Sequence, residues 1–317
     1  MTGLEVITMG RVSADIYPEQ TGVGLEDVTT FRKFLGGTAT NVAVAAARYG
    51  HRCAVITRVG EDPFGRYVRK ALASYGVSDM YVTEVPGIPT PVAFCEIFPP
   101  DHFPIYFYRF PTAPDLQIRA GELDFAAIRD AAIFWVTVTG LCQEPSRSAT
   151  LAALEARGRH GITVLDLDWR PVFWTSPQQA APLVRAALAH ATVAVGNQEE
   201  CQVAVGTSEP VAAAAALRGL GITLAVVKQG PRGVLAADDA GQVQVPPVPV
   251  QVVNGLGAGD AFGGALCHGL LRGWETRRTM RFANAAGAIV AGQLACSDAM
   301  PAEREVQRKL GEAGGDC

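Results

Sequence analysis

Short, nearly continuous apolar segments alternate with alanine-rich helical segments along most of the chain. An apolar run without polar alternation is typical of a strand buried on both faces, as in a parallel sheet. The strand candidates are residues 4–10, 53–60, 132–140, 162–168, 191–197 and 223–230. The helical patterns are residues 38–50, 64–76, 146–161 and 209–221. This rhythm predicts an α/β fold with a mainly parallel central sheet and helices on both faces.

Two segments depart from that rhythm. Residues 11–35 and about 86–112 are richer in proline, aromatic and polar residues, and part of the second alternates apolar with polar positions. They predict short antiparallel strands that form a small β lid over the main sheet, although a pair of long surface loops fits the pattern equally well. Residues 243–253 predict a further strand pair. No linker of disordered composition interrupts the chain, so residues 1–317 are expected to form a single domain.

Composition excludes several classes of protein. The chain has a net charge of −4 and no long basic run, so it is not expected to bind nucleic acid. Its seven cysteines are scattered without a Cys-x-x-Cys pair, which indicates reduced thiols and no zinc site. No apolar run is long enough to span a membrane, and the first residues lack the basic segment of a signal peptide. A cytoplasmic protein with no membrane contact is expected.

The stretch of residues 254–266, NGLGAGDAFGGAL, contains the clearest candidate for chemistry. Its glycines indicate a sharp turn, and the small residues after Asp260 indicate a helix start that packs closely on a neighbour. Free N–H groups at such a start converge on an anion, and their positive field is expected to keep Asp260 ionised as a general base. A strand-to-helix turn with an acid at its N-terminus is the structural alternative.

Two familiar phosphate-binding motifs are missing from the sequence. A P-loop requires Gly-x4-Gly-Lys-Ser/Thr, and no such run occurs. The dinucleotide fingerprint requires Gly-x-Gly-x-x-Gly early in its domain, whereas Gly255, Gly257 and Gly259 are spaced differently and lie late in the chain. An oxidoreductase is therefore disfavoured.

The run GAGDAF, together with GGTATNVA at residues 36–43, resembles the two signatures of the ribokinase-like (PfkB-type) carbohydrate kinases. The resemblance extends over essentially the whole chain. It implies a parallel α/β fold with a small β lid, and transfer of a phosphoryl group from ATP with Mg2+ to a sugar hydroxyl. For an enzyme of this kind, a homodimer formed through the lid is one expected assembly.

The resemblance also implies roles for individual residues. It makes Asp260 the catalytic base and places the anion hole at Gly257, Ala258 and Gly259. The implied sugar contacts are Asp15, Gly36, Gly37 and Asn41. The implied nucleotide and phosphate residues are Asn197, Lys228, Gly230, Gly233, Asn254, Gly255 and Asn284, with Glu200 acting through Mg2+. Many members read Asp-Thr-x-Gly-Ala-Gly-Asp where this chain has Asn254, Gly255 and Leu256, which leaves open whether a monovalent cation such as K+ is required.

Several further runs, including MGRVSADIYPEQ and DLDWRPVFW, resemble the 5-dehydro-2-deoxygluconokinase branch, which serves myo-inositol breakdown. The alternatives are a 2-keto-3-deoxygluconate kinase, a neutral-sugar kinase of the fructokinase or ribokinase type, and a sugar-binding regulator without turnover. An acid sugar would explain arginines near the lid. Arg109 is expected to pair with the substrate carboxylate, and Arg170 with the sugar or the phosphates. The structural alternative for Arg109 is a solvated lid charge, and Asp166 and Asp168 are as often structural as functional.

Overall fold

The computed structural model describes residues 3–314 and contains a ten-stranded main sheet with a separate four-stranded sheet. The order of the main sheet is β14-β13-β12-β11-β10-β9-β1-β4-β5, with β6 also paired to β4. Its strands are β1 (Val6–Met9), β4 (Cys53–Gly60), β5 (Val77–Ser78), β6 (Val82–Val85), β9 (Ile133–Thr137), β10 (Ile162–Asp166), β11 (Val193–Asn197), β12 (Leu224–Lys228), β13 (Val234–Asp238) and β14 (Gly241–Val245). All pairs are parallel except those that β13 makes with β12 and β14. The predicted parallel sheet is confirmed, with strand ends trimmed by up to three residues.

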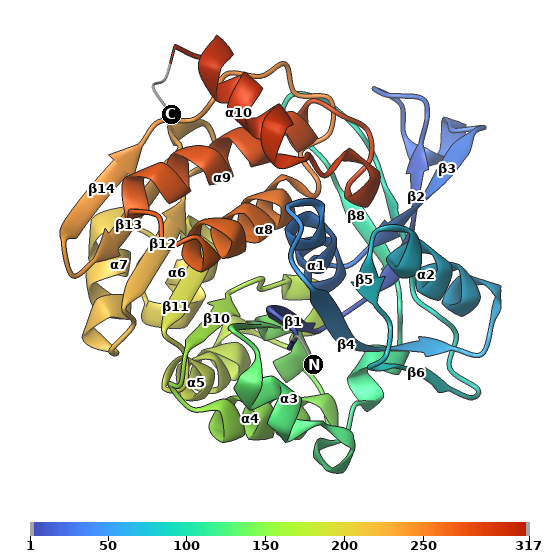
Figure 1. Cartoon of the computed structure of the whole chain (residues 1–317). Coiled ribbons are helices and arrows are strands. Elements are labelled where there is room, and N and C mark those ends of the chain that lie inside the picture. The colour runs from blue at the N-terminus through green and yellow to red at the C-terminus, as the bar shows by residue number, and fades with distance from the viewer. Residues whose placement is uncertain (1–2, 315–317) are drawn as a thin grey trace.

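Helices cover both faces of this sheet (Figure 1). They are α1 (Thr38–Arg48), α2 (Pro63–Ser74), α3 (Phe125–Asp130), α4 (Ser146–Arg157), α5 (Pro177–Leu188), α6 (Gln198–Val205), α7 (Pro210–Gly219), α8 (Ala258–Leu271), α9 (Thr276–Ala291) and α10 (Glu303–Glu312). One buried cluster joins α1, α2, α8 and α9 to the sheet, and a second joins α3 to α7 to its opposite face. Within the described residues, no helix combines the length and apolar character needed to cross a bilayer.

The helix starts follow local sequence chemistry. Asp62 accepts a hydrogen bond from the N–H of Gly65 and is followed by Pro63, which suits the first turn of α2. Ser176 caps α5 in the same way, again before a proline. At α6, Asn197 and Glu200 form a reciprocal capping box, so each side chain satisfies a backbone donor of the other. Each of these helices therefore starts directly after a polar residue that caps it.

The second sheet is the predicted lid, in the order β3-β2-β7-β8. Its strands are β2 (Ser13–Pro18), β3 (Phe31–Gly36), β7 (Val92–Cys95) and β8 (Ile105–Tyr108). The surface-loop alternative is thus wrong, but the expectation of a purely antiparallel lid is also wrong, because β2 and β7 pair in parallel. The two strands come from segments separated by the whole of α1, β4 and α2, so no hairpin turn fixes their relative direction.

The predicted strand pair at residues 243–253 is only partly present. Residues 243–245 belong to β14, and residues 246–252 have no regular secondary structure. Prolines 246, 247 and 249 lack the N–H that a sheet ladder needs, so the β-rich composition of this segment does not produce pairing.

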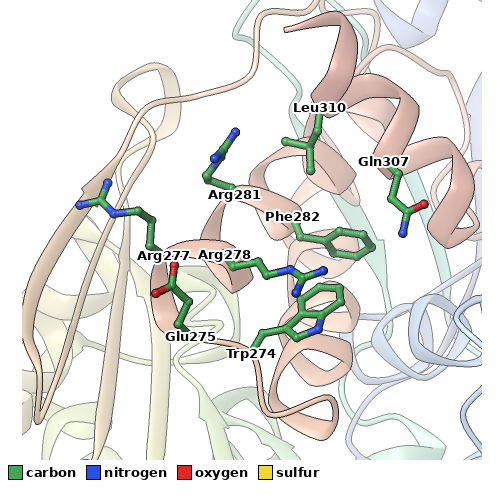
Figure 2. Close-up of a pocket in the computed structure, with 8 residues that line it drawn as sticks. All are labelled: Trp274, Glu275, Arg277, Arg278, Arg281, Phe282, Gln307 and Leu310. Atoms are coloured by element: carbon green, nitrogen blue, oxygen red, sulfur yellow. The ribbon is translucent and has the colours of Figure 1, made fainter. Parts of the chain in front are cut away.

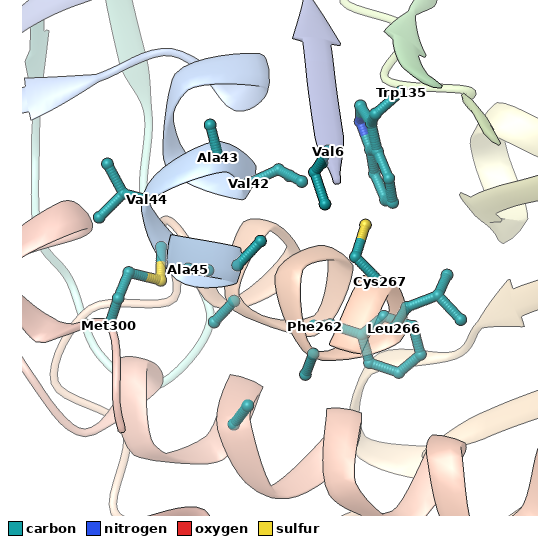
Figure 3. Close-up of a cluster of buried hydrophobic side chains, with 14 of the residues drawn as sticks. Val6, Val42, Ala43, Val44, Ala45, Trp135, Phe262, Leu266, Cys267 and Met300 are labelled. Carbon is teal, nitrogen blue, oxygen red and sulfur yellow. The ribbon is translucent and has the colours of Figure 1, made fainter. Parts of the chain in front are cut away.

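Helices α1 and α8 approach closely because α8 carries glycines at the contact. A Cβ on Gly264 would lie 2.2 Å from the Cβ of Ala45, and a Cβ on Gly263 would lie 2.8 Å from the Trp135 ring. Figure 3 shows Ala45 of α1 and Phe262 and Leu266 of α8 in the buried cluster that these helices form with Val6 and Trp135 of the sheet. The close packing expected after Asp260 is present, and it sets the distance between the starts of the two helices.

We expect Gly264→Ala to lower the free energy of unfolding by about 1–3 kcal/mol, because the added methyl group overpacks the contact with α1. Chemical denaturation measures this change. Gly311→Ala is the matched control, since Gly311 lies in α10 with nothing within 4 Å of the added carbon. The control should be neutral or stabilising, as alanine usually is in a helix. Equal effects from both substitutions would contradict the packing argument.

Candidate active site

A polar cavity of about 220 Å³ lies where the lid, the carboxyl ends of the central strands and the start of α8 meet. Carboxyl ends of parallel strands share one edge of the sheet, which is the usual place for a ligand in such folds. Its lining includes predicted residues from all three sources, namely Asp15, Gly37, Asn41, Arg170, Asn197, Glu200, Lys228, Gly255, Gly257, Gly259 and Asp260. The structure thus brings together side chains that are up to 245 residues apart in sequence.

A second, mostly apolar cavity of about 560 Å³ adjoins the first. Prolines and valines of residues 247–252 form one wall, and Ala258, Phe262 and α9 form another. It contains three further predicted nucleotide residues, Gly230, Gly233 and Asn284. The two cavities share Lys228, Gly255 and Gly259. A ligand in each would therefore meet its neighbour beside the start of α8.

The start of α8 has the geometry of an anion-binding site. Gly257 has φ +82°, in the left-handed region, and a Cβ there would lie 2.7 Å from the Cys296 sulfur. No side chain caps the helix, so its first N–H groups are free to meet a ligand from the cavities. Ala258 and Gly259 form this first turn, as the sequence predicts. A Cβ on Gly259 would lie 3.4 Å from the Lys228 ammonium, which adds a positive charge at the same place.

The side chain of Asp260 is held by a short chain of hydrogen bonds. The amide nitrogen of Asn41 donates to Asp260 Oδ2 at 2.7 Å, and the hydroxyl of Ser297 donates to the amide oxygen of Asn41 at 2.6 Å. Asn41 and Ser297 are buried. Because an ionised carboxylate can only accept, the amide must turn its –NH2 group toward Asp260, and its oxygen then faces the Ser297 hydroxyl, which also lies 2.9 Å from the Leu35 carbonyl. One carboxylate oxygen is therefore fixed in place, which leaves the other to act on a ligand.

Burial raises the pKa of Asp260 to about 6. The hydrogen bond from Asn41 and the guanidinium groups of Arg11 and Arg170 lower the pKa, whereas the Asp168 carboxylate raises it further. The expected positive field is thus present but does not outweigh desolvation. A carboxylate with a pKa near 6 is ionised at neutral pH and accepts a proton more readily than an ordinary aspartate, which suits a general base.

Charged groups of both signs line the rest of the polar cavity. Arg11 lies 3.7 Å and Arg170 lies 2.8 Å from the carboxylate of Asp168. Burial acts to raise the pKa of Asp168, but these two guanidinium groups outweigh it, and the net pKa is lowered. Burial acts to lower the pKa of Lys228, whereas the surrounding carboxylates raise it. The effect of the carboxylates is larger, so the ammonium stays charged.

Asp166 differs from its neighbours. Burial raises its pKa to about 8, because the Lys228 ammonium only partly offsets the loss of water and the repulsion from Asp168. Asp166 and Asp168 both line the cavity, so the functional interpretation of this strand end is the better supported one. At neutral pH the cavity holds three cationic side chains, Arg11, Arg170 and Lys228, beside ionised Asp168 and Asp260.

The capping box at α6 lies at the edge of the same cavity. Glu200 Oε2 accepts from the Asn197 N–H at 2.7 Å, and Asn197 Oδ1 accepts from the Glu200 N–H at 2.9 Å. One oxygen of Glu200 is thus committed to the helix, and the residue still lines the cavity. Among residues 3–314, no group of three or more His, Cys, Asp or Glu side chains forms a ready metal cage.

Three predicted residues, Gly36, Arg109 and Asn254, line neither cavity. Arg109 donates to Asp115 at 2.8 Å and packs 4.8 Å from the Phe173 ring centre. Because this buried ion pair occupies it, Arg109 is neither the expected carboxylate partner nor a solvated lid charge. The Asn254 side chain is wholly buried and bonds to backbone groups, so it does not reach the nucleotide cavity.

Two of the predicted sugar contacts, Gly36 and Asn41, help to position other side chains of the site. Gly36 lets the Asp15 carboxyl approach, since a Cβ there would lie 2.1 Å from that group. The Asn41 amide is bonded to Asp260 and Ser297, although the residue lines the polar cavity.

Sequence reasoning missed Arg11, Tyr17 and Ser297. Arg11 replaces Arg109 as the lid-side arginine of the polar cavity, and its Nε is a buried donor with no partner among the described residues. Tyr17 donates to Asp15 at 2.7 Å and lies 3.1 Å from the Cys296 sulfur. The only sequence signal for Arg11 was its place between an apolar strand and the lid.

A third cavity, of about 150 Å³, is separate from this site (Figure 2). It lies between α9 and α10 and contains three arginines, of which Arg278 stacks 4.2 Å from the Trp274 ring centre. None of its residues lines the polar cavity or its apolar neighbour.

Comparison with known proteins shows which family the chain belongs to. The model of the pfkB family of carbohydrate kinases matches residues 4–303. The chain belongs to this family. A 5-dehydro-2-deoxygluconokinase from Geobacillus thermodenitrificans is 32% identical, with 96% of this chain and 92% of the relative covered. An enzyme of the same name from Photobacterium profundum is 33% identical, over 94% of this chain and 92% of the relative. The protein is a carbohydrate kinase.

Solved structures of this family have the same architecture. A PfkB protein from Polaromonas has a TM-score of 0.84 and 25% identity, over 96% of this chain and 99% of that one. A doubly substituted fructokinase from Vibrio cholerae, solved with fructose, ADP and a potassium ion, has a TM-score of 0.85 and 26% identity. The match covers 97% of this chain and 99% of the fructokinase chain. The ribokinase-like fold of this kinase is thus established.

We expect Ser297→Ala to raise the apparent pKa seen in the pH profile of kcat/KM by about half a unit or more, equal to about 0.7 kcal/mol. Without the Ser297 hydroxyl the Asn41 amide is supported on one side only, and its hydrogen bond to the ionised form of Asp260 is weakened. The KM for ATP should stay the same. Ser297→Thr, which keeps a hydroxyl, should restore the wild-type profile. An unchanged pH profile in Ser297→Ala would show that Ser297 supports only the local fold.

Proposed function

We propose that this kinase transfers the γ-phosphate of ATP to a primary hydroxyl of an acid sugar, converting 5-dehydro-2-deoxy-D-gluconate to its 6-phosphate in myo-inositol breakdown. The observation that carries the proposal is the Asp260 carboxylate, held by Asn41 in the polar cavity, one residue after Gly259, which lines both cavities. Relatives at 32% and 33% identity over nearly the whole chain carry the name of this activity. Because ATP is supplied inside the cell, we place the enzyme in the cytoplasm, as one kinase domain.

In the proposed reaction, Asp260 removes the proton of the attacking hydroxyl as the oxygen forms its bond to phosphorus. The free N–H groups of Gly257, Ala258 and Gly259 stabilise the negative charge of the transferring group. Lys228, charged and half-buried at the same place, supports the phosphates. A lid that covers the polar cavity excludes water, which would otherwise compete with the sugar hydroxyl.

The apolar cavity suits the adenine and ribose of ATP, since its volume and its proline and valine walls fit a flat, largely apolar group. Asn284 lines this cavity, and its amide also donates to the Pro246 carbonyl at 2.9 Å, which holds one wall in place. Asn254, in contrast, contributes through the loop rather than through contact with the nucleotide.

Mg2+ is the metal that the family implies, and the residues present fit it. Asn197 and Glu200 supply oxygen atoms at the polar cavity, and magnesium in kinases binds one or two carboxylates together with phosphates and water. Bound there, it would neutralise phosphate charge. We assign Glu200 to the Mg2+ ion, through the carboxylate oxygen that is not used in the capping box.

The basic groups in the polar cavity support an acid sugar over a neutral one. Arg11 presents a buried, unpartnered Nε, and a substrate carboxylate would satisfy it through a charge-assisted hydrogen bond. Arg170 lies on the other side of Asp168 and has a side chain that is 37% exposed, so it is available to substrate or phosphate. A 2-keto-3-deoxygluconate kinase would use the same groups. The Vibrio cholerae neighbour, solved with fructose, keeps a neutral-sugar kinase as the other candidate.

A homodimer through the lid remains part of the proposal. Phe31, Tyr106 and Tyr108 on the lid strands expose 39%, 43% and 66% of their surfaces. Exposed aromatic residues on a small sheet favour contact with a partner.

We expect Asp260→Asn to lower kcat by about 10²–10⁴-fold, because the amide does not accept the hydroxyl proton. Thermal unfolding and ATP binding by calorimetry should be unchanged. Asp239→Asn, at an exposed carboxylate paired with Arg218, is the matched control and should keep full activity. More than about half of wild-type turnover in Asp260→Asn would rule out this base.

Arg11→Met should raise the KM for 5-dehydro-2-deoxy-D-gluconate about tenfold or more, because a charge-assisted bond is lost and about 1.4 kcal/mol is one decade. The KM for ATP should change little. Arg32→Met is the control, since Arg32 is an exposed lid arginine. ATP-coupled assays across acid and neutral sugars measure both effects. If the wild-type enzyme preferred fructose to every acid sugar, the proposed substrate class would be wrong.

A further inference from the structure

The buried side chain of Asn254 joins two loops next to the active site. Its amide nitrogen donates to the Leu294 carbonyl at 2.8 Å, and its amide oxygen accepts from the Leu256 N–H at 3.1 Å. Its own N–H donates to the Ala291 carbonyl at the end of α9. Asn254 is 0% exposed. The loop that leads to the anion-binding start of α8 is therefore fastened to the segment after α9 by one amide.

The two partners determine which way the amide lies. The Leu256 N–H can meet only an acceptor, and the Leu294 carbonyl can meet only a donor. An asparagine provides one of each in a single side chain. Both partners are satisfied without any other group, and an unsatisfied buried backbone group would cost about 1–3 kcal/mol.

Many members of the family have an aspartate where this chain has Asn254. A carboxylate at this position could still accept from Leu256, but its second oxygen would face the Leu294 carbonyl. Two buried acceptors, one of them charged, do not satisfy each other. A cation between them would, and K+ is a cation that proteins bind through carbonyl oxygens. The fructokinase neighbour from Vibrio cholerae was solved with a potassium ion.

We propose that the Asn254 amide takes the place of a monovalent cation in this protein, so that its active-site loop is held without K+ or Na+. The donor set does not fit such an ion, because the –NH2 group points at the carbonyl that would bind it. Gly257, three residues on, packs against Cys296, and this places the bond at the junction that positions the anion hole. The amide thus fixes the loop permanently, where an ion would fix it only when bound.

The first test replaces all K+ and Na+ by tetramethylammonium at constant ionic strength. Wild-type kinase activity should change by less than about twofold when K+ is added up to about 100 mM. Because the ionic strength is constant, the screening of surface charges does not change during this titration. This activity assay rests on the proposed substrate and on ATP. A wild-type enzyme that is inactive in tetramethylammonium and recovers with K+ would overturn the proposal.

The second test uses Asn254→Asp and does not depend on the substrate. In tetramethylammonium this variant should be less stable than wild type, and K+ at about tenfold its half-saturating concentration should raise its Tm by about 2 °C. The wild-type Tm should be the same in K+ as in tetramethylammonium at equal ionic strength. Asn254→Ala is the control, since it loses the amide without gaining a carboxylate, and K+ should not restore its Tm. An Asn254→Asp Tm that ignores K+ would refute the proposal even if the kinase assignment holds.

Discussion

The active site depends on the hydrogen bond between Asn41 and Asp260, which connects the start of α1 with the start of α8 across 219 residues of sequence. The bond is possible only because the two helices pack backbone against small side chains, with Gly264 of α8 against Ala45 of α1. Larger residues at the contact would move the helix starts apart and separate the carboxylate from its donor. The two sequence signatures therefore describe one structural unit, in which close packing provides the distance and the amide provides the orientation.

Electrostatics then distribute the roles around this unit. Burial alone would leave several carboxyl groups of the polar cavity neutral, and the pKa of Asp166 near 8 shows that outcome. The pKa of Asp168 is instead lowered, because two arginines flank its carboxylate. Asp260 lies between these cases, with a pKa of about 6. One hydrogen bond and more distant positive charges are sufficient to keep it ionised at neutral pH, yet they leave it basic enough to accept a proton.

Much of this could be predicted from the sequence, because apolar runs report burial and glycine-rich junctions report tight turns. The parallel sheet, the lid segments and the cavity residues around Asp260 belong to this group. The errors concern partners that local pattern does not reveal. Arg109 was expected in the site, but Asp115, six residues later, pairs with it. Arg11 reaches the site because β1 ends beside β9 and β4, which only the strand order shows. The parallel pairing of β2 with β7 likewise depends on how separate segments meet in space.

The fold also separates binding from chemistry. Asp15, Tyr17 and Phe107 enter the polar cavity from the lid, whereas the anion-binding turn, Lys228 and Asp260 belong to the main sheet and its helices. The proposed base and the anion-binding turn are held relative to each other by α1, α8 and the loop that Asn254 fastens. The lid side chains that we propose as sugar contacts, such as Asp15, lie instead on a separate four-stranded sheet, which joins the core near residues 10–13 and 36–38 and by the connections to β7 and β8. A change of sugar can therefore be accommodated in the lid while the phosphate-transferring geometry stays constant, which explains how one family scaffold can serve both neutral and acid sugars.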